Sequence, residues 1–231
     1  MRIGIIGAGN IGGTLAERLT ALGHEVSISN SRGPQTLQDV AAQTGATAVP
    51  VEEAARDKDL VVVTIPQRRV LDLPKGLFAD ARADLVVVDT GNYYPRQRDG
   101  RIDGIEEGLT ESRWVEQQLG HPVIKAFNNI YADHLMNNGQ PAGTQGRIAL
   151  PVAGDDENAK AVVMRLIDDL GFDAVDAGGL DESWRQQPGS AVYTSDLDVS
   201  GVKQGLADAQ PQRGAEWRAT PDSPGSFTDP R

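Results

Sequence analysis

Patterns typical of buried strands and amphipathic helices alternate along the first half of the chain. In the first thirty residues, a short apolar run leads through glycines to apolar positions at helical spacing, namely Ile11, Leu15, Leu19 and Leu22. Continuous β-branched runs follow at residues 59–66 and 84–92, with a shorter one at 122–127. Strands that are buried on both faces of a parallel sheet have this composition. Their alternation with helices predicts a doubly wound α/β sheet.

Weaker patterns fill the spaces between these strands. We expect a helix over residues 34–44, with Pro34 in its first turn, then a short strand over 46–49 and a helix over 51–56. Residues 93–110 are rich in Arg, Asp and Gly, and we expect a long loop there.

A second, smaller α/β unit is predicted after Asn138, beyond a linker with the sequence "NGQPAGTQG". We expect a strand over 147–154, a helix over 155–171, a strand over 172–178 and a further helix over 195–209. The acidic residues at 155–157 suit the positive end of the predicted helix. From Pro211 onward the chain is polar and contains prolines, so it cannot build a core of its own. We therefore divide the chain into a domain over 1–140, a small C-terminal α/β subdomain over 141–210 and an extended tail over 211–231.

Composition excludes several classes of function. Hydrophobic content of 39% and charged content of 24% are ordinary for a soluble protein, and no apolar run is long enough to span a bilayer. We expect a cytoplasmic protein without a membrane partner. The chain has no cysteine, and its three histidines, His24, His121 and His134, lack the spacing of metal ligands, so we expect no metal. A net charge of −11 argues against a nucleic-acid partner.

The glycine turn at the start of the chain has the spacing of a dinucleotide-binding motif. In "IGIIGAGNIGG" the pattern G-x-G-x-x-G follows a predicted strand and opens a helix, which is the context that gives the motif weight. The first glycine permits the tight turn, the second lets a pyrophosphate approach, and the third lets the helix pack on the strand. We therefore predict a Rossmann domain in which the turn binds the cofactor through Gly7, Gly9, Asn10, Ile11 and Gly12. The alternative is a glycine-rich turn that binds nothing.

The stretch "ISNSRGP", residues 28–34, indicates which cofactor is bound. NAD-binding sites place an acidic residue at the end of the second strand to bind the ribose hydroxyls. This chain has Asn30, Ser31 and Arg32 there, which would bind a 2′-phosphate rather than repel it. We predict NADP(H) as the cofactor. The alternative for Arg32 is a solvated turn residue.

With these residues in view, the chain resembles the coenzyme F420-dependent NADP oxidoreductases, or deazaflavin reductases, whose Rossmann module recurs in the STEAP metalloreductases. The resemblance rests on "GAGNIG", "SR" at 31–32, "TIP" at 64–66 and the segment 152–178, and covers most of residues 1–180. It implies that Thr64, Ile65 and Pro66 border the pyrophosphate and the nicotinamide ribose. It also implies that Ala126, Phe127 and Asn128 border the nicotinamide. The alternative is that these residues are structural, with Pro66 ending a strand and Asn128 capping a helix.

The acceptor is not identified by the sequence. Aromatic and polar residues beyond the resemblance could form an acceptor pocket, namely Trp184, Arg185, Gln186, Gln187 and Tyr193. We find no convincing catalytic pair, although Asp89 and Lys125 lie at strand ends. Hydride transfer to a planar ring needs orientation more than acid–base help, so we expect a small-molecule acceptor such as coenzyme F420 or a flavin.

Two other functions remain open. One is an NADPH-dependent reductase of a small carbonyl or imine, with Tyr193 or Lys125 as the proton donor. The other is a non-enzymatic NADP(H)-binding redox sensor. Trp217 and Phe227 in the polar tail lead us to expect a homodimer, in which the segment from Asp181 onward packs against the neighbouring subunit.

Overall fold

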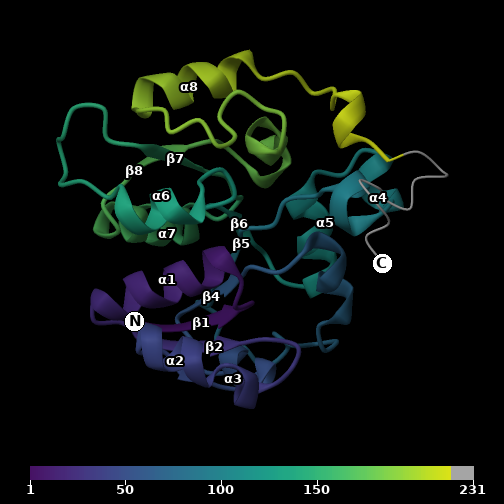
Figure 1. Cartoon of the computed structure of the whole chain (residues 1–231). Helices are drawn as coiled ribbons and strands as arrows, with labels where there is room; N and C mark the ends of the chain where they lie inside the picture. Colours follow the sequence, from purple (N-terminus) through teal and green to yellow (C-terminus); the bar gives the residue numbers. More distant parts are fainter. Residues whose placement is uncertain (220–231) are drawn as a thin grey trace.

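The protein is built around a six-stranded parallel sheet with the strand order β3-β2-β1-β4-β5-β6 (Figure 1). The computed structural model describes residues 1–219. The strands are β1 (Arg2–Ile6), β2 (Glu25–Ser29), β3 (Thr47–Ala48), β4 (Leu60–Val63), β5 (Val86–Asp89) and β6 (Ile124–Lys125). This order and the parallel pairing confirm the predicted doubly wound Rossmann sheet.

Helices cover both faces of this sheet. In chain order the helices of residues 1–219 are α1 (Asn10–Ala21), α2 (Gln38–Thr44), α3 (Val51–Ala55), α4 (Asp103–Glu106), α5 (Glu111–Leu119), α6 (Ala132–Asn137), α7 (Glu157–Asp169) and α8 (Val199–Asp208). Helix α8 packs on the smaller unit instead of the six-stranded sheet. Shorter helical turns lie at Pro34–Thr36 (η1), Gln67–Asp72 (η2), Pro95–Asp99 (η3), Leu180–Gln186 (η4) and Ala215–Trp217 (η5).

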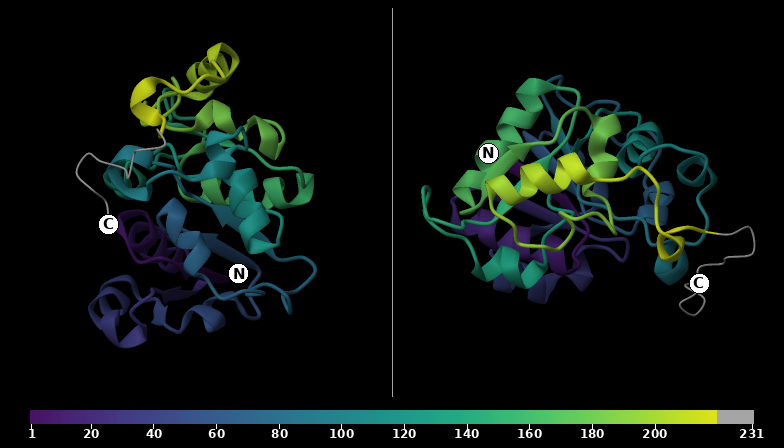
Figure 2. Two further views of the ribbon diagram at one scale, coloured as in Figure 1. Left: turned by 90° about the vertical axis from the view of Figure 1, so that its right-hand side faces the viewer. Right: turned by 90° about the horizontal axis from the view of Figure 1, so that it is seen from above.

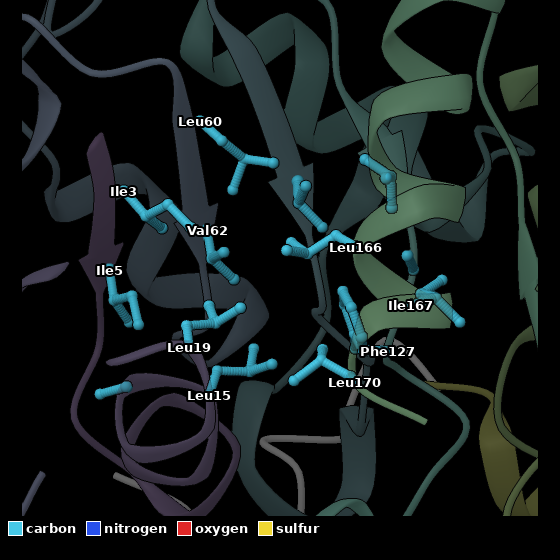
Figure 3. Close-up of a cluster of buried hydrophobic side chains, with 14 of the residues drawn as sticks. Ile3, Ile5, Leu15, Leu19, Leu60, Val62, Phe127, Leu166, Ile167 and Leu170 are labelled. Atoms are coloured by element: carbon cyan, nitrogen blue, oxygen red, sulfur yellow. The ribbon is translucent and has the colours of Figure 1, made fainter. Parts of the chain in front are cut away.

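Two hydrophobic clusters hold the helices to the sheet. On one face Ile3, Ile5 and Val62 pack with side chains of α1 and α7, several of which are drawn in Figure 3. On the other face Val61 and Val63 pack with residues of α3 and α5, among them Ala54 and Trp114. All four residues of β4 are buried, which explains their uninterrupted apolar composition.

The smaller unit consists of the parallel strands β7 (Ala149–Val152) and β8 (Asp173–Asp176), connected by α7. A single antiparallel bridge between Lys125 and Ala153 attaches it to the edge of the large sheet at β6. Helix α8 lies on the side of β7 and β8 that faces away from the large sheet (Figures 1 and 2). The predicted strand–helix–strand unit and the small C-terminal extension are thus confirmed.

Several predicted elements differ from the observed ones. Residues 34–44 are not one helix, because the chain leaves helical geometry at Leu37, whose side chain is buried in the core, between η1 and α2. The last predicted helix starts at Val199 rather than at 195, because Asp198 caps it by accepting a hydrogen bond from the Gly201 amide at 2.9 Å.

Residues 93–110 are not the predicted loop. They contain η3 and α4, which are organised around the buried carboxylate of Asp99. This carboxylate accepts hydrogen bonds from the Tyr94 amide at 2.8 Å and from the Arg98 guanidinium at 2.9 Å. A buried acid that organises its own segment leaves no hydrophobic periodicity in the sequence.

Candidate functional site: a dinucleotide-type cleft

A cleft of about 840 Å³ opens at the carboxyl ends of β1, β2 and β4. Ligands of doubly wound sheets bind at this edge, where the strand order reverses between β1 and β4. Loops after three strands and the first turn of α3 line the cleft, and they contribute Gly7, Gly9, Asn30, Ser31, Arg32, Glu52, Thr64, Ile65, Pro66, Arg69, Asp72 and Leu73 among others.

The three motif glycines have different surroundings. A side chain on Gly7, which has a φ of +120°, would place Cβ 2.2 Å from the Thr64 carbonyl oxygen. On Gly12 it would lie 2.0 Å from the Gly7 carbonyl oxygen. On Gly9 it would meet no atom of residues 1–219 within 4 Å. The fold therefore requires Gly7 and Gly12, whereas Gly9 leaves open the space above the turn.

Helix α1 begins directly at this open space. Gly9 is its N-cap, and no side chain among the described residues caps the helix. The first amide groups of a helix have no partner inside the helix, and the helix dipole is positive there, so this end can bind an anion.

The turn after β2 presents a cation to the same cleft. The Asn30 side chain shapes the turn, since its Oδ1 accepts from the Arg32 amide at 2.9 Å and its Nδ2 donates to Thr36 Oγ1 at 3.0 Å. Ser31 and Arg32 are exposed at the cleft. Within residues 1–219 the Arg32 guanidinium has no hydrogen-bond or ion-pair partner. These donors fit a dinucleotide that carries phosphate groups at two positions. The N-terminus of α1 can bind its pyrophosphate, and the Ser31 hydroxyl and the Arg32 guanidinium can bind a further phosphate.

The residues expected to border the nicotinamide lie outside the walls of the cleft. Ala126, Phe127 and Asn128 are buried and do not line the cleft, and neither do Asn10, Ile11 and Gly12. Asn128 Nδ2 donates to Asn92 Oδ1 at 3.1 Å and to the Gln186 carbonyl at 2.7 Å. Its Oδ1 accepts from Gln186 Nε2 at 2.9 Å. The Asn128 side chain therefore connects the end of β6 to η4 rather than capping a helix.

Lys125 and Asp89 form a closed ion pair beneath the strand ends. The Lys125 ammonium is 3.2 Å from Asp89 Oδ2 and donates to the Gly91 carbonyl, and Ser112 Oγ donates to the same carboxylate oxygen at 2.7 Å. Lys125 and Asp89 are each about 1% exposed, so the pair is sealed from solvent. The pair has the contacts of a structural link between β5, β6 and α5.

The proposed acceptor residues do not surround one pocket. Trp184 and Gln187 line a hollow of about 200 Å³ beside residues 208–214. Arg185 lines another hollow, lies over the Trp184 ring at 4.4 Å and pairs with Glu182 at 2.6 Å. The Tyr193 hydroxyl is hydrogen-bonded to that of Tyr94.

The described part of the tail packs on its own chain. Arg213 pairs with the buried carboxylate of Glu111, and Trp217 contacts the rings of Tyr94 and Tyr193. Burial raises the pKa of Glu111, and the attraction of Arg213 offsets only part of that rise. Residues 181–219 thus have intramolecular partners, while Phe227 lies outside the described residues.

Sequence reasoning missed several residues of the cleft wall, including Pro50, Glu52, Arg69 and Leu73. They follow β3 and β4, and every loop at the carboxyl edge of the sheet can reach the ligand. Only their position after predicted strands could have identified these residues, because they belong to no motif.

Over residues 1–219, no group of three or more His, Asp or Glu side chains could hold a metal ion. In this range no helix is long and apolar enough to cross a membrane.

The fold and the cleft together define a dinucleotide-binding protein of the Rossmann type. Comparisons with known proteins narrow this class. Residues 2–93 match the family described as NADP oxidoreductase, coenzyme F420-dependent. The chain belongs to this family of NAD(P)-binding Rossmann oxidoreductases, which confirms the resemblance seen in the sequence.

Three individual proteins are similar to this chain. The structure of a hypothetical protein, SMa0349 from Sinorhizobium meliloti, is 32% identical with a TM-score of 0.70, over 85% of this chain and 95% of that one. YjhV of Escherichia coli (strain K12) is 44% identical over 71 residues, which are 31% of this chain and 50% of that protein. Metalloreductase STEAP3 of Rattus norvegicus is 25% identical over 180 residues, which are 78% of this chain and 34% of STEAP3. The chain thus spans half of one curated relative and a third of the other.

Proposed function

We propose that this protein is an NADPH-dependent oxidoreductase that transfers a hydride between NADP(H) and a planar acceptor such as coenzyme F420 or a flavin. The observation that carries the proposal is the cleft, in which the N-terminus of α1 and the guanidinium of Arg32, which has no partner within residues 1–219, face the same space. The family description and the absence of an acidic residue between Ile28 and Pro34 agree with this cofactor.

The residues of the cleft would bind and orient the cofactor. The backbone of Gly7, Ala8 and Gly9, which lines the cleft at the positive end of α1, would bind the pyrophosphate, and Ser31 and Arg32 would bind the 2′-phosphate. Thr64, Ile65 and Pro66 would direct the nicotinamide toward the ends of β4 and β5. When bound, the reduced nicotinamide supplies a hydride, that is, two electrons and one proton, and the acceptor takes its second proton from solvent.

The Arg32 guanidinium tests the choice of cofactor. Loss of a charge-assisted contact to the 2′-phosphate should weaken NADPH binding by about ten- to a hundredfold in Arg32→Ala, with NADH binding nearly unchanged. Isothermal titration of both cofactors measures this. Arg56→Ala is the matched control, because Arg56 is exposed and does not line the cleft. Equal affinity of the unmodified protein for NADPH and NADH would refute the proposal.

The other two functions predict different behaviour. A carbonyl or imine reductase needs a proton donor that the substrate can reach, and the enclosure of Lys125 weighs against that residue. NADPH oxidation with a panel of flavins, deazaflavins, carbonyls and imines separates the two enzymes. Tight NADPH binding without turnover on any of them would favour a redox sensor. A cytoplasmic location and a homodimer remain predictions from the sequence.

A further inference from the structure

The segment after α8, residues 211–219, crosses from the smaller unit to the side of the molecule formed by α4 and α5 (Figures 1 and 2). We call it the strap. Six of its nine residues are exposed. Its main contacts are the Arg213–Glu111 ion pair, a hydrogen bond from the Ala219 amide to Glu106 at 2.8 Å, and the Trp217 side chain.

Trp217 occupies a socket made by Tyr94, Tyr193 and Gly189. The indole ring is 6.0 Å from the Tyr94 ring and 6.5 Å from the Tyr193 ring, centroid to centroid. Gly189 forms the floor, because a Cβ there would lie 2.7 Å from Trp217 Nε1. Its φ of +87° also disfavours any other residue. A flat backbone floor with aromatic walls suits a planar conjugated ring.

The polar edge of the socket also suits such a ring. One hydroxyl of the Tyr94–Tyr193 pair donates to the other, which leaves one O–H proton for a ring carbonyl or nitrogen. Burial raises the pKa of both hydroxyls, so both remain protonated at neutral pH.

The socket lies near the ends of the central strands. Asn92 follows β5 by three residues, and its backbone carbonyl accepts a hydrogen bond from Arg98 at 2.6 Å. The Arg98 guanidinium in turn lies over the Tyr94 ring at 5.0 Å. This is the end of the sheet toward which the cofactor's nicotinamide is directed in the proposed function, on which the present inference rests.

We propose that the Tyr94–Tyr193–Gly189 socket binds the conjugated ring of the acceptor, and that Trp217 competes with the acceptor for it. The strap then acts as a built-in competitor that must leave the socket before the acceptor enters.

Riboflavin is the probe, because it presents the ring without a phosphate, and FMN is titrated beside it to measure any contribution of the phosphate. Quenching of flavin fluorescence reports binding to the full-length protein. Trp217→Ala should bind riboflavin about tenfold more tightly than the unmodified protein. In the unmodified protein the Trp217 side chain fills the socket in most molecules, and the apparent affinity for riboflavin is reduced to the fraction of molecules whose socket is empty. Leu22→Ala is the control and should leave binding unchanged, because Leu22 is an exposed apolar residue at the end of α1 and contacts no residue of the socket. Adding Tyr94→Ala to Trp217→Ala should reverse the gain.

A second measurement needs no variant. Hydrogen exchange of the amides at 214–219 in the unmodified protein should accelerate when riboflavin is saturating. Riboflavin binding that is unchanged or weaker in Trp217→Ala would overturn the inference, as would unchanged exchange in the strap. NADPH titration of the same proteins judges the proposed function separately. A protein that binds NADPH but shows no Trp217 effect refutes only the socket, and one that fails to bind NADPH refutes the cofactor assignment.

Discussion

Gly9 and Gly12 lie three residues apart and serve different purposes. The space above Gly9 is open, and its φ of −81° is accessible to any residue. Gly12 faces the Gly7 carbonyl, and a Cβ there would overlap with backbone that cannot move away.

Substitutions at these positions should therefore separate binding from folding. Gly9→Val should abolish NADPH binding and leave the melting temperature without cofactor close to that of the unmodified protein, because the side chain fills only the space of the pyrophosphate. Gly12→Ala should lower the melting temperature instead. Gly13→Val is the matched control, since Gly13 also has open space around its Cβ position but does not line the cleft. Thermal unfolding and cofactor titration measure the two effects, and normal NADPH binding by Gly9→Val would contradict the assigned role.

Among individual residues, the constrained glycines could be predicted from the motif, whereas the contacts of single polar side chains could not. The G-x-G-x-x-G spacing predicts which glycines are constrained, because its geometry is local. The surroundings of Asn128 could not be predicted, because its partners Asn92 and Gln186 are 36 and 58 residues away in the chain. Position after a buried strand indicated that Asn128 lies near the cofactor edge, but not that its amide is already fully bonded.

At the scale of elements, Arg18 of α1 joins the ends of two other helices. Its guanidinium donates to the Leu135 carbonyl in α6 at 2.6 Å, to the Met136 carbonyl at 3.0 Å and to the Leu170 carbonyl after α7 at 2.5 Å. The last carbonyls of a helix lack partners within it and carry partial negative charge, so one cation stabilises both ends.

Arg18→Ala should lower the free energy of unfolding by about 2–3 kcal/mol, since it leaves partly buried carbonyls without donors and removes charged hydrogen bonds. Urea unfolding measures this. Arg165→Ala on α7 removes an exposed arginine and should change stability by less than about 0.5 kcal/mol. An equal effect of the two substitutions would show that Arg18 does not stabilise the helix ends.

The continuity of the apolar pattern decided which elements could be predicted from sequence. The helices α1 and α7 and the strands β4 and β5 were predicted because each carries a sustained apolar pattern. The helix α5 was missed, although Thr110 caps it by accepting a hydrogen bond from the Arg113 amide at 3.2 Å. Its buried residues include the polar Glu111 and Ser112, so the buried face of α5 does not appear as a hydrophobic pattern in the sequence. The helices α4 and α6 are too short to show a period.

At the scale of the whole molecule, the Glu111–Arg213 pair links α5 to the strap. The raised pKa of Glu111 makes its contribution to stability depend on pH. The folded state retains the Glu111 proton to higher pH than the unfolded chain does. The contribution of Glu111 to stability is therefore greatest below its unfolded pKa of about 4.5, and it is lost as the pH rises through the pKa of the folded state.

Glu111→Gln removes this group from the titration. Between about pH 4 and pH 8, the stability of the unmodified protein should therefore fall relative to that of Glu111→Gln as pH rises. Urea unfolding of both proteins across this range gives the difference directly. Glu107→Gln replaces an exposed acid nearby and should give a flat difference. A flat difference for Glu111→Gln as well would mean that its carboxyl titrates alike in the folded and unfolded states.

The sequence could predict the sheet as a whole, because each βα unit repeats a local pattern. It could not predict the strap, because Pro211 to Ala219 has no periodicity and its partners come from three other segments. The sequence predicts a homodimer from Trp217 and Phe227. In the structure, Tyr94 and Tyr193 give the Trp217 indole a place on its own chain, and the homodimer stays a prediction.

The separation of Glu111 and Arg213 has a consequence for biosynthesis. The two residues are 102 positions apart, and at ordinary rates of translation the acid is added to the chain about 5–20 s before its partner is. The large sheet has all six strands by Lys125, so it can form in that interval around a carboxyl that is still without its arginine. Burial of an unpaired carboxylate is unfavourable, so in such a nascent chain Glu111 is protonated or remains in contact with water. The native ion pair can therefore form only after Arg213 has left the ribosome.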